Sequence, residues 1–270
     1  MGNTFAVMNT KGVMGNSPIV VALARSLATL HKKKVLVIDS DAQAGISSML
    51  MTSARLHQLQ CQGLTLAGFL VCTVLRKAPA LWPQFAVRHI LDVEGARDVY
   101  LVPSGMQLML FERVVSKQSL RADLDEAIGR LLKQVRPVFD VVIIDCPAGR
   151  SVLAEGWRRA ADFHLSLSKA ERHGAGDPIC GINADNPEMG FATDLDIVIN
   201  MKDRESAPTD GEPRMGQIAL LAPPDRFYNP NSSSDAGHLA RDLTAQILAC
   251  LTRENGLWQR RPRLQTRALA

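Results

Sequence analysis

Two apolar stretches that each end in an aspartate constrain the fold of this chain more than any other feature. They read KKVLVID at residues 33–39 and FDVVIID at residues 139–145. Aliphatic and β-branched residues follow one another there without alternating polar positions, which is typical of strands buried on both faces. Such strands occur in parallel sheets whose two faces are both covered by helices. The sequence therefore predicts an α/β protein built on a mostly parallel sheet.

The rest of the chain alternates between further strand patterns and helical patterns. Additional strands are predicted at residues 4–9, 99–103, 163–167, 195–200 and 217–222. Helices are predicted at residues 17–30, 44–57, 64–77, 105–116, 119–135, 151–160 and 236–254, where apolar positions recur at helical spacing. This alternation predicts a doubly wound sheet with helices on both faces.

Length and composition indicate one large domain with a basic tail. The chain has 270 residues, of which 46% are hydrophobic and 21% charged, with a net charge of +4. We assign residues 1–255 to a single domain and residues 256–270 to a flexible tail that carries four arginines. The sequence shows no signal peptide and no apolar run that approaches the ~20 residues of a membrane span. A cytoplasmic protein without a membrane span is therefore expected.

A glycine-containing loop follows the first predicted strand and opens the first predicted helix. Residues 7–18 read VMNTKGVMGNSP. Free amides at a helix N-terminus attract phosphate oxygens, and Gly12 and Gly15 let the backbone pass close to such an anion. Ser17 can offer its hydroxyl to Mg²⁺, and Pro18 is tolerated in the first helical turn. The loop therefore predicts a phosphate-binding site.

Three aspartates stand at the carboxyl ends of predicted strands. Asp39 and Asp41 follow one strand, and Asp145 ends another. Ligands of such sheets bind at this edge, where carboxylates can hold Mg²⁺ through water or orient an attacking water. The loop and the two acidic strand ends together are a stronger signal than any one of them alone.

These motifs resemble those of the ParA/MinD class of P-loop ATPases, which have a deviant Walker A motif. KGVMGNSP (11–18) resembles the KGGxGK[ST]T motif of that class, and IDSDAQAG (38–45) resembles its DxDPQG stretch. VVIIDCPAG (141–149) resembles its Walker B strand, and VYLVPSG (99–105) resembles its fourth strand. The similarity extends from residue 3 to about residue 167.

The resemblance implies ATP and Mg²⁺ as cofactors and assigns roles to individual residues. Lys11 would reach the phosphates of a dimer partner, and Asp41 would position the hydrolytic water. Ser17 would bind Mg²⁺, which Asp39 and Asp145 would support through its waters. The nucleotide would be bound by Gly12, Val13, Met14, Gly15, Asn16, Ser17 and Pro18 of the loop, and by Asn200, which would contact adenine.

The resemblance also implies partners. Proteins of this class form nucleotide-dependent homodimers and position plasmids, chromosomes or other cargo. They usually act with a second, ParB-like protein that stimulates hydrolysis, and many bind DNA without sequence preference. A ParA-like switch in partitioning or positioning is therefore the expected function.

The sequence departs from the working motif at four positions. Asn16 stands where the motif has the lysine that neutralises phosphate charge, and Val13, Pro18 and Ala42 replace a glycine, a threonine and a proline. Losing one group that stabilises a developing anion typically costs ~3 to 4 kcal/mol, or about 10² to 10³ in rate. We therefore expect a weak ATPase with slow or impaired hydrolysis.

Other interpretations stay open. The chain could be a non-catalytic scaffold of the same fold that binds protein or DNA without nucleotide. Asp39 and Asp41 could be helix-capping acids, and the glycines of the loop could serve packing alone. The basic tail could be solvated or could contact DNA, and the segment at 171–190 has no assigned role. A dinucleotide-dependent oxidoreductase is disfavoured, because GxGxxG does not follow the first strand.

Overall fold

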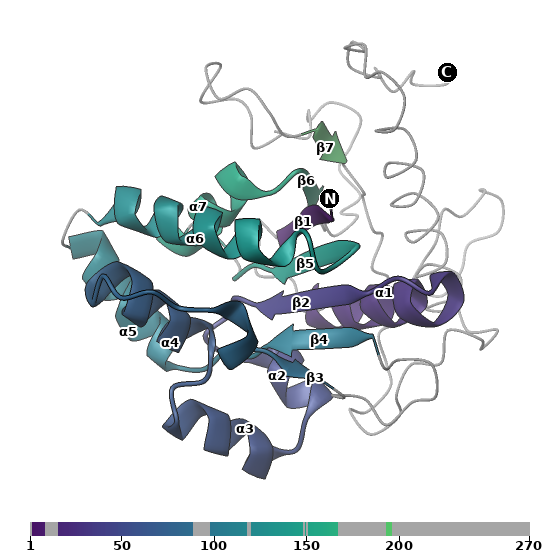
Figure 1. The fold of residues 1–270 in the computed structure, drawn as a ribbon, viewed down its shortest axis with the longest axis horizontal. Coiled ribbons are helices and arrows are strands. Elements are labelled where there is room, and N and C mark those ends of the chain that lie inside the picture. Colours follow the sequence, from purple (N-terminus) through teal and green to yellow (C-terminus); the bar gives the residue numbers. More distant parts are fainter. Residues whose placement is uncertain are drawn as a thin grey trace, which may run out of the picture.

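A seven-stranded sheet forms the centre of the molecule (Figure 1). The computed structural model describes residues 2–8, 16–88, 98–117, 120–147, 149, 151–166 and 193–195. The strand order is β3-β4-β2-β5-β1-β6-β7, and all neighbours are parallel except the β3–β4 pair. The strands are β1 (Asn3–Met8), β2 (Val35–Asp39), β3 (Val87–Arg88), β4 (Val99–Val102), β5 (Val141–Asp145), β6 (Phe163–Ser166) and β7 (Thr193–Leu195). The predicted mostly parallel sheet is confirmed.

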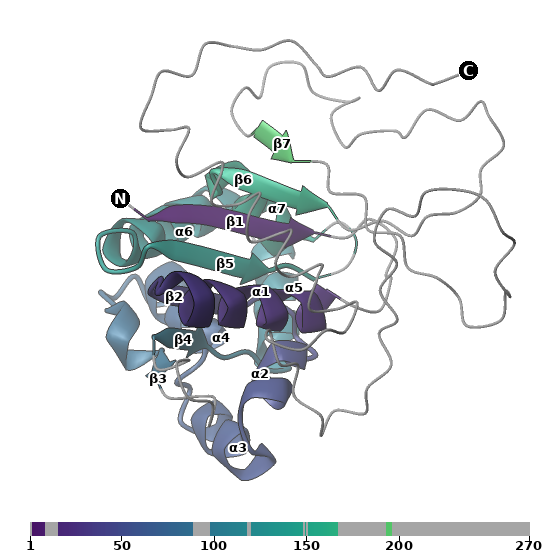
Figure 2. The ribbon, with the colours of Figure 1, turned by 90° about the vertical axis from the view of Figure 1, so that its right-hand side faces the viewer.

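Helices pack on both faces of this sheet, which confirms the doubly wound arrangement. They are α1 (Asn16–His31), α2 (Gly45–Leu50), α3 (Ser53–Cys61), α4 (Leu66–Leu70), α5 (Gln107–Lys117), α6 (Arg121–Val135) and α7 (Val152–Ala160). Alternate strand residues divide between two cores. Val37 and Ile143 pack with α1, whereas Leu36 and Ile144 pack with α4 to α7 on the other face (Figure 2). Because both faces are covered, every residue of β2 and β5 is buried.

The local structure differs from the predictions in three places. The predicted helix 44–57 is two helices, because Met51 is extended and the Thr52 side chain accepts a hydrogen bond from the Arg55 amide to start α3. Residues 71–75 continue α4 as a π-helical turn. The short strand β3 and a 3₁₀ turn at Trp82–Gln84 were not predicted, since neither has a run long enough to show a period.

Several predictions fall on residues that the structure does not describe. They are the strand 217–222, the helix 236–254, the segment 171–190, the domain boundary at residue 255 and the tail 256–270. Of the predicted strand 195–200, only residue 195 is described, as the last residue of β7. These segments stay predictions.

One stretch is longer and more apolar than the sequence analysis allowed. Residues Ser53–Leu75 are long and apolar enough to span a membrane by length and composition alone. A turn interrupts this stretch between α3 and α4, where Gly63 has a φ of 68°. Leu66, Phe69 and Leu70 beyond the turn are buried in the core. Core helices pass the same length test, so the stretch is weak evidence for a membrane span.

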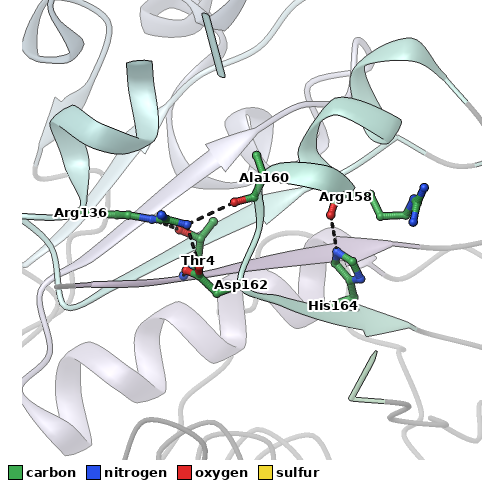
Figure 3. A network of polar contacts seen from close by, with 6 residues as sticks. All are labelled: Thr4, Arg136, Arg158, Ala160, Asp162 and His164. Carbon is green, nitrogen blue, oxygen red and sulfur yellow. Dashed lines mark hydrogen bonds and ion pairs between the residues drawn. The ribbon is translucent and has the colours of Figure 1, made fainter. Parts of the chain in front are cut away.

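A polar network joins three elements at the edge of the sheet where the parallel strands begin (Figure 3). Arg136, which follows α6, donates to Thr4 Oγ1 (3.3 Å), to the Ala160 carbonyl oxygen (3.2 Å) and to Asp162 Oδ1 (2.8 Å). The Thr4 amide donates to the other oxygen of Asp162 at 2.8 Å. His164 lies beside this network, with Nε2 2.7 Å from the Arg158 carbonyl oxygen. We call Thr4, Arg136, Ala160 and Asp162 the N-edge network.

Candidate functional site

The carboxyl ends of β2 and β5 meet the first turn of α1 at the opposite edge of the sheet, where the parallel strands end. Asp39 and Asp145 are direct register partners in the parallel pair β2–β5. Ser17 Oγ in the first turn of α1 donates a hydrogen bond of 2.7 Å to Asp145 Oδ2. The structure therefore brings Ser17, Asp39 and Asp145 together, as the order of motifs predicted.

Asp145 is buried and keeps one oxygen without a hydrogen-bond partner. Its Oδ1 is inaccessible to solvent and has no partner among the described residues. The pKa of Asp145 is raised to about 8, mainly by burial and also by the nearby Asp39 carboxylate, while the hydrogen bond from Ser17 limits the rise. The carboxyl group is therefore largely protonated at neutral pH until a cation or donor compensates its charge.

Asp39 is equally buried, but both of its oxygens have partners. Oδ2 accepts hydrogen bonds from the Ser47 amide (2.8 Å) and from the Ser47 hydroxyl (2.6 Å). Oδ1 accepts one from the Asp41 amide at 3.2 Å. Burial raises the pKa of Asp39 to about 6, and the hydrogen bonds from Ser47 limit the rise. Because Ser47 lies in the first turn of α2, Asp39 acts as a helix-capping acid, which was the alternative interpretation.

Asp41 lies at the start of a tight turn that leads into α2. Its Oδ1 accepts a hydrogen bond from the Gln43 amide at 2.9 Å, so its side chain stabilises the turn. Ala44 in this turn has a φ of 54° and a ψ of 43°, in the left-handed region. Holding a residue with a Cβ there costs on the order of 1 kcal/mol. The turn is therefore strained, and surrounding contacts must hold it.

Three residues that the sequence analysis missed complete the arrangement around the acids. A Cβ at Gly45 would lie 2.8 Å from Ser17 Oγ, so any larger residue here would require Ser17 to rotate or α2 to shift. Ser47 Oγ accepts a hydrogen bond from the Ser104 amide at 3.0 Å. Trp157 Nε1 donates to Ser40 Oγ at 2.8 Å, which ties α7 to the residue between the two acids. Gly45 ends the IDSDAQAG stretch, where the sequence analysis gave it no role, and Ser47 and Trp157 stand at ordinary helical positions in the sequence.

Most residues of the predicted phosphate loop lie outside the described part of the chain. These residues are Lys11, Gly12, Val13, Met14 and Gly15, and Asn200 is also outside. Asn16 is the first residue of α1, and its side chain is not described. Pro18 lies in the first turn of α1, as predicted, where a missing N–H removes no helical hydrogen bond.

The described donors fit a magnesium ion that is bound largely by phosphate and water. In the part of the chain that the structure covers, His, Cys, Asp and Glu nowhere gather in a group of three able to hold an ion directly. Mg²⁺ keeps several waters and needs only one or two protein ligands when phosphates supply the rest. The Ser17 hydroxyl could serve as such a ligand, and the unpartnered Oδ1 of Asp145 could accept a hydrogen bond from a metal-bound water.

Comparison with known proteins agrees with this geometry. Residues 2–174 match the model of the family described as AAA domain (AAA_31). The chromosome-partitioning ATPase Soj of Treponema pallidum is 28% identical over 167 residues, which are 60% of this chain and 55% of that protein. A ParA family protein of Chlamydia pneumoniae is 29% identical over 170 residues, 62% of this chain and 59% of that protein. The chain therefore spans less than two thirds of the length of either relative.

A solved structure of a protein from Corynebacterium diphtheriae has the same fold. It superposes with a TM-score of 0.50 at 17% identity, over 63% of this chain and 62% of that one. The family match covers more than half of the chain and includes β1, β2 and β5, whose ends form the site. The chain therefore belongs to the AAA domain family, and its sequence is ParA/MinD-like.

Proposed function

We propose that this protein is an ATP-binding switch with slow hydrolysis that acts in partitioning or positioning of a cargo. The observation that carries the proposal is the pair formed by Ser17 and Asp145, because one buried oxygen of Asp145 has no hydrogen-bond partner among the described residues. A buried polar atom of this kind costs free energy unless a ligand or water satisfies it. Magnesium with its waters would satisfy it in the nucleotide-bound protein.

Each residue of the site has a part in this proposal. Bound Mg²⁺ would neutralise phosphate charge. Ser17 would contribute its hydroxyl to the ion, and Asp145 would hold a metal-bound water. Asp41, half-buried at the rim of the site, would orient the attacking water. Lys11 would supply the positive charge that Asn16 lacks.

The wider role is proposed by similarity. The relative from Treponema pallidum is a chromosome-partitioning ATPase, and a role of this kind would place the present protein in the cytoplasm. We propose a homodimer that forms when nucleotide binds. A ParB-like partner protein and non-specific DNA are the further partners to test.

Isothermal titration of Mg-ATP, with the parent protein and with Asn16→Lys, tests the proposal. We expect the parent to bind Mg-ATP and the variant to hydrolyse it about 10² to 10³ times faster, because the lysine stabilises charge in the transition state. Lys11→Ala should abolish binding by the parent if Lys11 compensates for Asn16. Absence of binding by the parent at millimolar Mg-ATP would contradict the proposal.

The asparagine itself favours a second function. An amide at position 16 supplies no full charge to the phosphates, and a scaffold that ignores ATP would need none. If only Asn16→Lys binds Mg-ATP, the parent is a scaffold of the same fold. The same titration therefore separates the two functions.

A further inference from the structure

The two buried aspartates of the site occupy equivalent positions on neighbouring strands but differ in their hydrogen bonds. Asp39 accepts three hydrogen bonds from its own chain, one at Oδ1 and two at Oδ2. Asp145 accepts one hydrogen bond at Oδ2 and none at Oδ1 from the described residues. A metal-bound water would have to compete with internal donors at Asp39, whereas at Asp145 it would meet an oxygen to which no described residue donates.

We infer that Asp39 is a positioning residue that acts through Ser47, and that, among the described residues, support of the magnesium ion falls to Asp145 and Ser17. This inference deepens the proposed function, and its magnesium test rests on that function. It also revises the role that the family resemblance implies for Asp39. Ser47 lies outside the motifs that indicated the site, and its partner Ser104 lies in the VYLVPSG stretch, to which the sequence analysis gave no role in the site.

Ser47 connects three elements around the site. Its hydroxyl donates to Asp39 at the end of β2 and accepts from the Ser104 amide directly after β4. The Ser104 carbonyl oxygen in turn accepts a hydrogen bond from Gln60 Nε2 of α3 at 3.0 Å. Asp39, Ser47 and Ser104 are all fully buried or nearly so. The hydroxyl therefore fixes α2 against two strands in a region that water does not reach.

The consequence of this connection reaches the proposed magnesium ligand. Gly45 lies two residues before Ser47 and packs against Ser17 Oγ, and the Asp41 amide is held by Asp39 itself. Ala44, which lies between Asp41 and Gly45 in the chain, has a left-handed backbone conformation that surrounding contacts must stabilise. Removing the hydroxyl of Ser47 should therefore let the turn relax, which would shift Asp41 and move Gly45 away from Ser17.

Hydrogen exchange of the ligand-free protein tests the connection without any nucleotide. In Ser47→Ala the Ser104 amide loses its acceptor, and we expect its exchange to become about tenfold faster or more, because one buried hydrogen bond is worth roughly a factor of ten. Ser48→Ala is the matched control, since Ser48 is exposed on the same helix, and should leave this rate unchanged. Equal rates at Ser104 in the two variants would overturn the inference.

Binding of ATP with Mg²⁺ and of ATP with EDTA separates positioning from metal support. The quantity to compare is the Kd of ATP in EDTA divided by the Kd of ATP with Mg²⁺. If Asp39 only positions, Asp39→Asn and Ser47→Ala weaken the binding of both forms by a similar factor, and this ratio stays within about twofold of the parent's. Asp145→Asn should lower that ratio by about 10- to 100-fold, because it removes an outer partner of the metal.

Two outcomes of the binding experiment contradict the inference. One is a ratio of the two Kd values that falls as far in Asp39→Asn as it does in Asp145→Asn. The other, which decides the question if Asp39→Asn does not fold, is Ser47→Ala binding Mg-free ATP as tightly as the parent. If the parent binds no ATP, the proposed function fails, and the exchange experiment still decides whether Ser47 holds the loop after β4.

Discussion

The two edges of the sheet place buried or half-buried charges in opposite situations. At the edge where the parallel strands begin, Arg136 and Asp162 form an ion pair of 2.8 Å (Figure 3). Arg136 also donates to Thr4 Oγ1 and to the Ala160 carbonyl oxygen, and the Thr4 amide donates to Asp162. At the edge where they end, Asp39 and Asp145 lie side by side without a described cation between them, and burial raises the pKa of both.

This difference indicates that the first edge contributes to stability and the second is built for a ligand. A charge with several hydrogen-bond partners can be half-buried at little cost, whereas adjacent buried carboxyl groups destabilise the folded state when both ionise. The second edge is where ligands of doubly wound sheets bind. Four predictions test the comparison, in order of decreasing expected effect.

Arg136→Ala should lower the free energy of unfolding by about 3 kcal/mol, because it leaves Asp162 and the Ala160 carbonyl oxygen without their partner. Urea denaturation measures the change. Arg130→Ala is the matched control on α6, since its pair with Glu126 is exposed, and should cost less than about 1 kcal/mol. Equal losses would show that the N-edge network has no special weight.

The stability of the ligand-free protein should fall as the pH rises from 5 to 8. The pKa of Asp145 is raised to about 8 in the folded protein, so the folded state binds more protons than the unfolded state between about pH 4 and pH 8. The stabilising contribution is complete below about pH 4 and is lost as the pH approaches 8. We expect a loss on the order of 3 kcal/mol, measured by urea denaturation at several pH values, because the folded state binds close to one extra proton over most of these three pH units.

The control for this pH dependence is Asp145→Asn, which cannot ionise and should give a flatter profile. Asp39, with a pKa of about 6, should retain a smaller dependence in the variant, confined to lower pH. Stability that rises with pH in the parent would contradict the assignment of a protonated Asp145.

Gly45→Ala should lower the free energy of unfolding by about 1 kcal/mol and weaken Mg-ATP binding. Its Cβ would lie 2.8 Å from Ser17 Oγ, so Ser17 must rotate away from Asp145 or α2 must shift. Thermal unfolding and titration calorimetry measure the two effects. Gly129→Ala on α6 is the control, because a Cβ there meets no described atom within 4 Å. A variant that matches the parent in both would show that α2 does not constrain Ser17.

Lys34→Met should have the smallest effect, a loss of about 0.5 kcal/mol, because it removes a cation–π contact and keeps the apolar stem. Lys34 Nζ lies 5.4 Å from the Tyr100 ring centre and 5.2 Å from that of Phe139, at the edge where the strands begin. Urea denaturation beside Lys33→Met, which has no ring contact among the described residues, isolates this term. A gain in stability would contradict the prediction, because it would mean that the ammonium group of Lys34 destabilises the folded state.

The sequence predicted which residues gather at the site better than it predicted the role of each residue. Apolar runs ending in Asp39 and Asp145 predicted adjacent strand ends, and the structure confirms the pairing. Ser17 was expected near them and bonds to Asp145. The break at Thr52 was missed, because helical periodicity continues across it while a side-chain cap starts the second helix.

What the sequence determined by itself was the order of strands and helices and the edge at which the acids gather, because burial periodicity and strand direction are local properties of the chain. Which aspartate has an oxygen without a partner among the described residues was decided only by tertiary structure. Ser47 of α2 reaches Asp39, with Ser104 bonded behind it, whereas Ser17 reaches only one oxygen of Asp145. Hydrogen bonds between distant segments depend on how closely the helices pack. The close packing of Gly45 in α2 against Ser17 in α1 is one such contact, and it exists only in the folded molecule.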